Sequence, residues 1–381
     1  MKIREYILSG LALCLVAFGC SQNAGQEAQV NEAEPLFMNI IPEAEGGYSL
    51  VSVSPFDGSG DTLRVRKPLR RLIVMSTSHV GFLSAIGGDP AIVGVSGAEY
   101  VCDSSVAKRI EEGAVADVGF DASPDYEKIL ALKPDLLLAY SVSPVKSRFL
   151  SKVESLGIKT FIVNEHLERH PLARAAYVRL FGALTGNMPA ADSVLKVVSE
   201  NYDRLRDSVR VSLKAKDARN QGNGSGNDNR RRILVNIPYK DQWFIPGQEN
   251  YLSHLFEDAG GEILGAEAGS SISGQISVER AYSLSKEADL WMNVGWCLTE
   301  NQLLSVNPLF GDFLGNIKAN AEARGFDKKN VVWNDNKRLN AKGGNDFWES
   351  GVVRPDLLLR DLVGIFSGDS TATSEYYRPI L

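Results

Sequence analysis

The sequence predicts an α/β protein of two Rossmann-like lobes, each with a central sheet, joined by a single long helix and separated by a ligand cleft. Apolar strand-like runs alternate with helical patterns in each half, an order typical of parallel sheets covered by helices. The segments 123–141 (SPDYEKILALKPDLLLAYS) and 277–294 (SVERAYSLSKEADLWMNV) repeat one design of serine cap, first-turn glutamate, helix, acidic turn and strand. Between the halves, apolar residues recur at three- and four-residue spacing over 172–213, which indicates the joining helix.

The length and composition are those of an ordinary soluble protein with room for two domains. The chain has 381 residues, of which 44% are hydrophobic and 23% charged, and its net charge is −6. The basic triplet at 230–232 follows a polar loop and precedes a strand, so we interpret it as a solvated loop end. No nucleic-acid partner is therefore expected.

The N-terminus has the pattern of an export signal. Basic Lys2 and Arg4 precede an apolar run over 7–18 that is too short to span a membrane comfortably, and small residues lead to Cys20. Residues 1–20 resemble a bacterial lipoprotein signal peptide, which implies that Cys20 carries lipid. The alternative is an ordinary secretory signal in which Cys20 is incidental. Residues 21–35 are polar and acidic and lack an apolar period, and a flexible tether is predicted over 21–45.

Residues 46–171 predict the first lobe. A hairpin is expected over 47–66 around the turn at 56–60. Strands are expected at 71–76, 91–96, 135–140 and 158–164. The intervening helices are expected after a cap at 76–78, after Ser123, and over 147–157.

The linking helix at 172–213 is interrupted at 186–189 (GNMP), so it is either one kinked helix or two helices. Residues 214–230 are rich in glycine, asparagine and aspartate and predict a flexible surface loop. The second lobe is expected over 231–381. Cys102 and Cys297 fall in different lobes and are predicted to be free thiols.

Motifs of catalysis are missing from this chain. It contains no phosphate-binding glycine loop, no GxSxG and no HExxH. His166 and His170 are four residues apart, but Pro171 follows directly, which favours loop and capping roles over a metal pair. With only four histidines, a site for naked zinc or manganese is not expected. We predict that the chain is not an enzyme and has no intrinsic cofactor or protein-bound metal.

Aromatic and basic residues near predicted strand ends are the candidate ligand-binding residues. Ligands of two-lobed α/β proteins lie at the carboxyl ends of the strands. Aromatic rings there suit a large, flat, partly apolar ligand, and arginines suit its anionic groups. Core packing is the alternative for each aromatic, and capping or a surface ion pair is the alternative for Arg354. The candidates are His79, Tyr100, Tyr239, Trp243, Arg338, Trp348 and Arg354.

Glu127 and Glu279 occupy equivalent places in the two echoed segments. Each is expected on the first turn of its helix, where a carboxylate favours the positive end of the helix dipole. That stabilising role is one interpretation. The functional interpretation is a pair of acidic knobs, one per lobe, that dock on basic pockets of a partner.

Several of these segments, taken in order, resemble the periplasmic-binding-protein family (class III, helical-backbone type) that delivers ferric siderophores, haem and vitamin B12 to ABC importers. The matching pieces include RLIVMSTSHVGFLSAIGG, EKILALKPDLLLAY, LGIKTFIVNE and WFIPGQENYLSHLFEDAGGE. LERHPLARAAYVRLFGALTG, GGNDFWESGVVRPDLLLRDL and YYRPIL are similar to the Bacteroidetes lipoprotein branch. The resemblance implies small opening motions about a rigid helix and docking through Glu127 and Glu279. Ligand residues vary within the family and are carried over by location alone.

Together these observations predict a monomeric substrate-binding lipoprotein of the periplasm, held to a membrane by its lipid. It would capture an iron chelate, haem or corrinoid and deliver it to an ABC transporter permease dimer with its ATPase. The alternatives are a two-lobed α/β enzyme, such as a chelatase-like metal-tetrapyrrole protein, and a surface scaffold lipoprotein.

Overall fold

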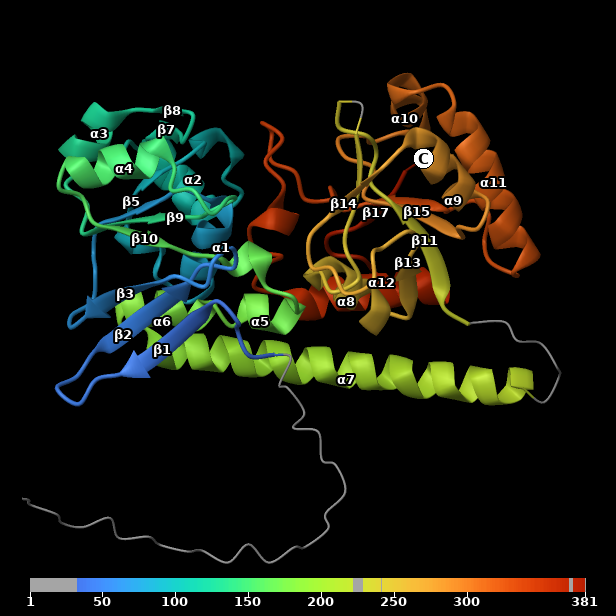
Figure 1. Cartoon of the computed structure of the whole chain (residues 1–381), viewed down its shortest axis with the longest axis horizontal. Coiled ribbons are helices and arrows are strands. Elements are labelled where there is room, and N and C mark those ends of the chain that lie inside the picture. Colours follow the sequence, from blue (N-terminus) through green and yellow to red (C-terminus); the bar gives the residue numbers. More distant parts are fainter. Residues whose placement is uncertain (1–32, 222–228, 241, 370–372, 381) are drawn as a thin grey trace, which may run out of the picture. The chain divides into compact units, whose positions relative to one another are not determined.

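The computed structural model describes residues 33–221, 229–240, 242–369 and 373–380, and two five-stranded sheets dominate them (Figure 1). The predicted signal peptide and Cys20 lie outside the described residues. The predicted α/β class, with two central sheets and a long helix, is confirmed.

The sheet of the first lobe is parallel and has the order β10-β9-β4-β5-β6. Its inner strands are buried at every residue because helices cover both faces, which explains their unbroken apolar runs. The elements are β4 (Leu72–Val74), α1 (Thr77–Ala85), η1 (Asp89–Ala91), β5 (Ile92–Val95), η2 (Ala98–Tyr100), α2 (Ser104–Glu111), β6 (Ala116–Asp117), β7 (Gly119–Phe120), β8 (Ser123–Pro124), α3 (Tyr126–Ala131), β9 (Leu136–Ala139), α4 (Arg148–Ser155) and β10 (Thr160–Ile162).

The sheet of the second lobe has the order β13-β11-β15-β16-β17, parallel except for the last strand. The second lobe also contains a two-stranded antiparallel ribbon formed by β12 and β14. The elements are β11 (Arg231–Val235), β12 (Trp243–Ile245), α8 (Tyr251–Asp258), β13 (Gly261–Ile263), β14 (Gly274–Ile276), α9 (Val278–Ser285), β15 (Leu290–Met292), α10 (Glu300–Val306), α11 (Phe310–Ala323), β16 (Val332–Asn334), η4 (Asp346–Trp348), α12 (Pro355–Ser367) and β17 (Arg378–Pro379).

The two lobes share one topology. With the two-residue edge strand β6 left aside, the second, first, third and fourth strands along the chain lie side by side as β5-β4-β9-β10 in the first lobe and as β13-β11-β15-β16 in the second. The echoed sequence segments form α3 with β9 and α9 with β15, which carry the third of these four strands in each lobe. The internal echo therefore marks structurally equivalent positions.

Three helices join the lobes: α5 (Pro171–Ala175), α6 (Val178–Thr185) and α7 (Met188–Gln221), preceded by η3 (Glu165–Leu167). Gly186 ends α6 in the left-handed conformation, with φ of +80°, so the chain breaks at the predicted interruption. The 34 residues of α7 span about 50 Å. Val194 and Leu195 of α7 pack against the cores of both lobes, so α7 fuses the two cores along one side (Figure 1).

Residues 335–353, which we call the bridge, connect the lobes a second time. The Asn340 side-chain amide donates to the carbonyl oxygens of Glu99 and Val101, both at 2.9 Å. The Glu349 carboxylate accepts the backbone N–H groups of Cys102 at 2.8 Å and Asp103 at 2.6 Å. Because the bridge leaves β16 of the second lobe and hydrogen-bonds the first lobe just beyond β5, it restrains the separation of the two sheets.

Local structure departs from the prediction at three places. A three-stranded antiparallel sheet of β1 (Met38–Pro42), β2 (Tyr48–Val53) and β3 (Gly60–Val65) replaces the expected hairpin and begins inside the expected tether. The buried Glu168 carboxylate fixes its start by accepting the N–H groups of Leu36 and Phe37. Helix α7 continues to Gln221, into the expected loop 214–230, because Lys, Ala, Arg and Gln in that segment are good helix formers. Asp125, not Ser123, caps α3.

Gly81 tests how tightly the bridge packs on the first lobe. A Cβ at Gly81, inside α1, would lie 2.1 Å from the carbonyl oxygen of Glu349. Gly81→Ala is therefore expected to lower the free energy of unfolding by about 1–3 kcal/mol, measured by urea denaturation.

Gly315→Ala is the matched control, because Gly315 is exposed in α11 and a Cβ there meets nothing within 4 Å. That change is expected to raise the free energy of unfolding by about 0.5–1 kcal/mol. Equal changes in the free energy of unfolding in the two variants would contradict close packing of the bridge on α1.

Candidate ligand-binding site

Exposed aromatic side chains occur in the segments that follow the parallel strands of both sheets. In the first lobe Tyr100 follows β5, Phe120 follows β6 and Tyr140 follows β9; in the second, Tyr239 follows β11 and Trp296 follows β15. Their exposed fractions run from 36% for Tyr140 to 69% for Tyr239, so each ring offers surface on which a ligand can stack. The bridge ties the loop after β5 to the loop after β16, so the carboxyl ends of both sheets meet at this side.

Trp296 is the most rigidly presented of these rings. Its side chain is 60% exposed, yet its loop is held on both sides. The Asn334 amide donates to the carbonyl oxygens of Gly295 at 2.8 Å and Cys297 at 2.9 Å, and the Asn336 amide reaches the same two oxygens at 3.4 and 3.2 Å. A clamped, exposed indole loses little conformational entropy when a ligand stacks on it.

Of the aromatic residues expected to bind ligand, Tyr100 and Tyr239 lie at the strand ends, exposed by 40% and 69%. Trp348 lies in η4 on the bridge, half exposed, with its ring edge-on to the buried Phe347 at 4.8 Å. These three side chains are accessible to a ligand. Tyr100 and Phe120 also contact each other, with ring centroids 6.2 Å apart.

Trp243 and His79 are fully buried and belong to the cores. Trp243 packs against both Trp291 and Phe313, which also stack on each other, and its indole N–H donates to the Val235 carbonyl at 2.9 Å. His79 packs against Phe181, and burial lowers the pKa of His79 to about 4, which keeps the imidazole neutral. Neither side chain reaches a surface in this structure, so we leave both out of the site. Each follows a predicted strand, and that placement does not distinguish a rim residue from a core residue.

Arg338 and Arg354 lie together on a cavity of about 520 Å³ between α1, α7 and the bridge. Both cations are already paired: Arg338 with Asp346 and Glu375, and Arg354 with the buried Asp356 through two hydrogen bonds. Arg354 therefore forms an ion pair, which was the alternative to ligand binding for this residue. Neither guanidinium is free to bind an anion.

Phe120, Tyr140 and Trp296 were missed at the sequence level. Trp296 sits in Gly295-Trp296-Cys297, just after the segment 277–294 that is expected to end in a strand, so the rule that found Tyr239 applies equally to it. Phe120 and Tyr140 also follow strand-like runs. The sequence does not separate them from Trp243, because the solvent exposure of a side chain depends on residues far away in the chain.

His166 and His170 have structural partners. The ring of His166 bonds Glu165 at 3.1 Å and the Ser141 carbonyl at 3.0 Å, while His170 caps α5. Burial opposes ionisation of Glu165, but Arg174 and His166 outweigh it and lower the pKa of Glu165. Among the described residues no group of three His, Cys, Asp or Glu side chains is placed to hold a metal ion, and Cys102 and Cys297 are free thiols.

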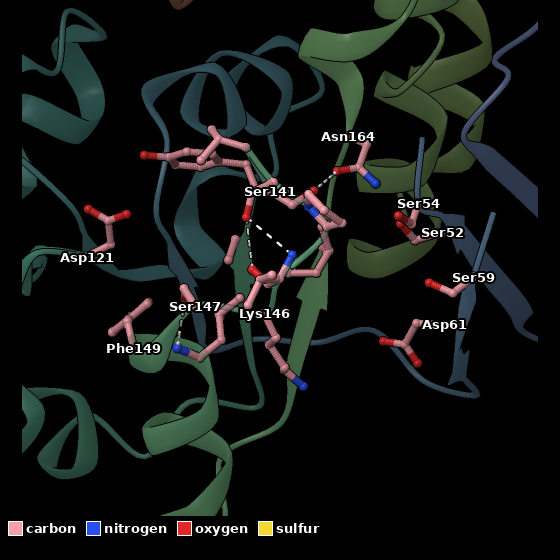
Figure 2. Close-up of a pocket in the computed structure, with 18 of the residues that line it drawn as sticks. Ser52, Ser54, Ser59, Asp61, Asp121, Ser141, Lys146, Ser147, Phe149 and Asn164 are labelled. Atoms are coloured by element: carbon pink, nitrogen blue, oxygen red, sulfur yellow. Dashed lines mark hydrogen bonds between the residues drawn. The ribbon is translucent and has the colours of Figure 1, made fainter. Parts of the chain in front are cut away.

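A separate cavity of about 290 Å³ opens beside Tyr140. Figure 2 shows it between strands β2 and β3 on one side and the loop after β9 on the other. Ser141 at its centre donates to the Asn164 amide oxygen at 2.8 Å, and the Asn164 amide nitrogen donates to the Val53 carbonyl at 3.0 Å. These bonds fasten the added sheet to the first lobe.

Glu127 and Glu279 lie on the first turns of α3 and α9, as expected, and both are exposed. A hydrogen bond from Ser277 lowers the pKa of Glu279. Neither carboxylate forms an ion pair within the described parts of the chain. The two helices are topologically equivalent, so the lobes present one uncommitted carboxylate each.

Comparison with known proteins decides the family. The profile described as "Periplasmic binding protein" matches residues 72–314, well over half of the chain. The chain belongs to the periplasmic binding protein family. It is therefore a binding component of transport and not an enzyme, and the expected enzymatic alternative is set aside. The match begins at β4, so the β1–β3 sheet lies outside it.

Relatives and solved structures agree with this membership. An uncharacterised lipoprotein of Methanocaldococcus jannaschii is 24% identical over 80% of this chain and 67% of its own length. An uncharacterised ABC transporter substrate-binding lipoprotein of Bacillus subtilis, YvrC, is 20% identical over 67% of this chain and 70% of its own length.

The fold is shared with solved binding proteins of low sequence identity. A periplasmic haem-binding protein from Pseudomonas aeruginosa superposes with a TM-score of 0.55 at 15% identity, covering 82% of this chain and 98% of its own. A periplasmic vitamin B12-binding protein of Vibrio cholerae gives 0.51 at 18% identity, covering 79% and 97%. Within the described residues of this chain, no helix is both long and apolar enough to cross a membrane.

Glu349 makes the stability of this periplasmic binding protein depend on pH. Burial, together with Asp346 and Asp103, raises the pKa of Glu349 from 4.5 to about 7. The folded protein then holds a proton that the unfolded chain has released, so the free energy of unfolding is expected to fall as pH rises from about 4.5 to 7. The contribution is at most roughly 3 kcal/mol.

Glu349→Gln should remove part of that decline, measured by urea denaturation at pH 5, 6, 7 and 8. Asp335 titrates in the same window, because burial raises its pKa to about 7, so Asp335→Asn should remove a separate part. An unchanged slope in Glu349→Gln would show that this carboxylate ionises freely in the folded state.

Proposed function

We propose that this protein is the substrate-binding lipoprotein of an ABC importer and captures a metal chelate between its lobes. The cargo is a ferric siderophore, haem or a corrinoid such as vitamin B12. The protein delivers it, as a monomer, to the inner-membrane permease dimer that works with an ATPase. The comparison proteins named as binding haem or vitamin B12, and the relative named as an ABC transporter substrate-binding lipoprotein, support this proposal.

The observation that carries the proposal is the set of exposed rings on the strand-end loops of both sheets. A flat, partly apolar chelate buries such rings by stacking, and two lobes supply them from opposite sides. The polar groups that a naked metal ion needs are not gathered among the described residues. The cargo therefore brings its own ligands to the metal.

The rigid connection between the lobes supports capture by a largely preformed site. α7 and the bridge restrain lobe separation at two places, so binding costs little reorganisation. In this respect the protein differs from a receptor that closes over a sugar or an amino acid through a wide hinge motion.

Membrane attachment and docking complete the proposal. Cys20 carries the lipid, which places the protein in the periplasm on a membrane surface, as in the Bacteroidetes lipoprotein branch. The relatives described as lipoproteins support this placement. Glu127 and Glu279 dock on basic pockets of the permease dimer, one lobe on each subunit.

Trp296→Ala is expected to weaken chelate binding by about 10- to 50-fold, the loss typical of a central aromatic contact. Titration of the purified protein with haem, cyanocobalamin, cobinamide and ferric siderophores, followed by visible absorption and tryptophan fluorescence, measures the change. The protein should remain folded, because this side chain is 60% exposed.

Leu309→Ala is the control, since Leu309 is an exposed apolar residue of the same lobe at the N-cap of α11, and the affinity of this variant for the chelate should not change. If wild-type protein binds none of these chelates, the proposed function is wrong. If it binds one and Trp296→Ala binds equally well, the indole is not part of the site.

The double variant Glu127→Lys with Glu279→Lys is expected to abolish uptake while leaving chelate affinity unchanged. Reversing both charges turns attraction to basic pockets into repulsion. Uptake of labelled chelate into proteoliposomes or cells carrying the importer measures the first effect, and titration of the isolated protein measures the second.

Glu45→Lys with Glu262→Lys changes the net charge equally at two other exposed positions and should transport normally. Loss of chelate affinity in the Glu127 and Glu279 variant would place those carboxylates at the ligand instead. Normal transport by it would remove them from the docking surface.

A further inference from the structure

The cavity beside Tyr140 has a wall that the matched family segment does not provide. Strands β2 and β3 form that wall, and they precede residue 72, where the family match begins. The opposite wall is the loop 140–147 and the start of α4 (Figure 2). The hydrogen bonds of Asn164, whose side chain is almost completely buried, hold the two walls together. This chain has therefore added a fixed, shaped cavity to the first lobe.

The floor of this cavity is apolar. Met75, Phe149, Leu150 and Ile162 line it from β4, α4 and β10. Its volume of about 290 Å³ admits a chain of several methylene groups. When an apolar part of a ligand displaces water from these side chains, the free energy of the complex falls.

The rim of the cavity is negatively charged. Asp61 lines it from β3 and Asp121 from the β7–β8 turn, on opposite sides of the loop 140–147 (Figure 2). Neither carboxylate has an ion-pair partner among the described residues. The one cation on the lining, Lys146, is bonded to Glu154 at 2.6 Å and is thereby neutralised. Burial and the facing Asp121 carboxylate raise the pKa of Tyr140, which agrees with a negative potential there.

Ser52 supplies an uncommitted hydroxyl in the same cavity. The residue is 6% exposed, and its hydroxyl makes no hydrogen bond within the described residues. A hydroxyl in the cavity wall can donate a hydrogen bond to a ligand or accept one from it. An apolar floor, two free carboxylates and a free hydroxyl together match a primary alkylammonium group, with methylenes on the floor and the ammonium at the rim.

We infer that this cavity holds an alkylammonium arm of the cargo whose flat portion stacks on the exposed aromatic rings. Tyr140 belongs to both surfaces, and Asp121 is next to Phe120 in the chain, so the cavity opens beside two of the exposed rings. The inference rests on the proposed function and narrows it. The cargo is a chelate with a pendant amine, and a chelate whose free arms are all carboxylates is disfavoured by Asp61 and Asp121.

The test uses two probes that differ only in the charge of the arm. Ferrioxamine B is a ferric trishydroxamate with a free pentylammonium arm, and in N-acetyl ferrioxamine B that nitrogen is neutral. Wild-type protein should bind the first on the order of tenfold more tightly than the second, because the rim of the cavity is negatively charged and only the first probe carries a cationic arm. The preference should shrink as salt rises from 20 mM to about 500 mM, because the charges are solvent-accessible.

Asp61→Asn with Asp121→Asn should erase the preference by weakening ferrioxamine B and leaving the acetylated probe unchanged. Glu45→Gln with Glu262→Gln alters the net charge equally and should keep the preference. Both sites are exposed, so circular dichroism should show unchanged folding.

Equal affinity for the two probes in wild-type protein, or a preference that survives in the Asp61 and Asp121 variant, would overturn the inference and leave the proposed function standing. Binding of haem or cobinamide with neither ferrioxamine bound would also overturn it. Failure to bind any of these chelates would instead overturn the proposed function.

Discussion

The packing of α7 against the cores of both lobes is the constraint on which the rest of this structure depends. Val194 and Leu195 contact both cores, and Leu172 and Ala175 of α5 belong to the core of the second lobe while α6 belongs to that of the first. Sliding one lobe on the other would expose these apolar surfaces to water, at about 25 cal/mol for each Å² uncovered. The bridge adds hydrogen bonds from Glu349 and Asn340 at a second place. The strand-end loops of the two sheets are therefore held at a nearly fixed separation.

A fixed separation explains why exposed aromatic rings persist at the strand ends. In a hinged receptor such rings would be free to close on each other when empty, whereas here the joint keeps them apart and wetted. The cost of exposing Trp296 and Tyr239 is then recovered when cargo binds. Asn334 and Asn336 hydrogen-bond the loop of Trp296 and so restrain the position of this single ring in the same way. Selectivity among cargoes then depends on the residues around the rings. The β1–β3 sheet adds such residues beside Tyr140.

Much of the fold could be predicted from the sequence because its signals are local. Buried parallel strands require unbroken apolar runs such as 72–74 and 136–139, and the echo between 123–141 and 277–294 located the equivalent strands β9 and β15 of the two lobes. Gly186 marked the helix break because an αL cap favours glycine. Strand β1 and the extension of α7 to Gln221 were missed. The short segment of β1 (MNIIP) becomes a strand by pairing with β2, whereas the polar residues after 213 are compatible with loop and helix alike, and helix propensity decides.

By itself the sequence determined the α/β class, the two-lobed repeat, the helical joint and the positions of Glu127 and Glu279, since periodicity and capping are properties of neighbouring residues. Only the tertiary structure decided which aromatic residues face solvent. Both tryptophans come after strand-like runs in the sequence, but Trp243 is packed in the core against Trp291 and Phe313, whereas Trp296 is 60% exposed. Burial depends on residues far away in the chain, and so does the pairing of Arg338 and Arg354 with carboxylates. The site therefore depends on contacts between residues that are far apart in the sequence, whereas the fold follows largely from local sequence patterns.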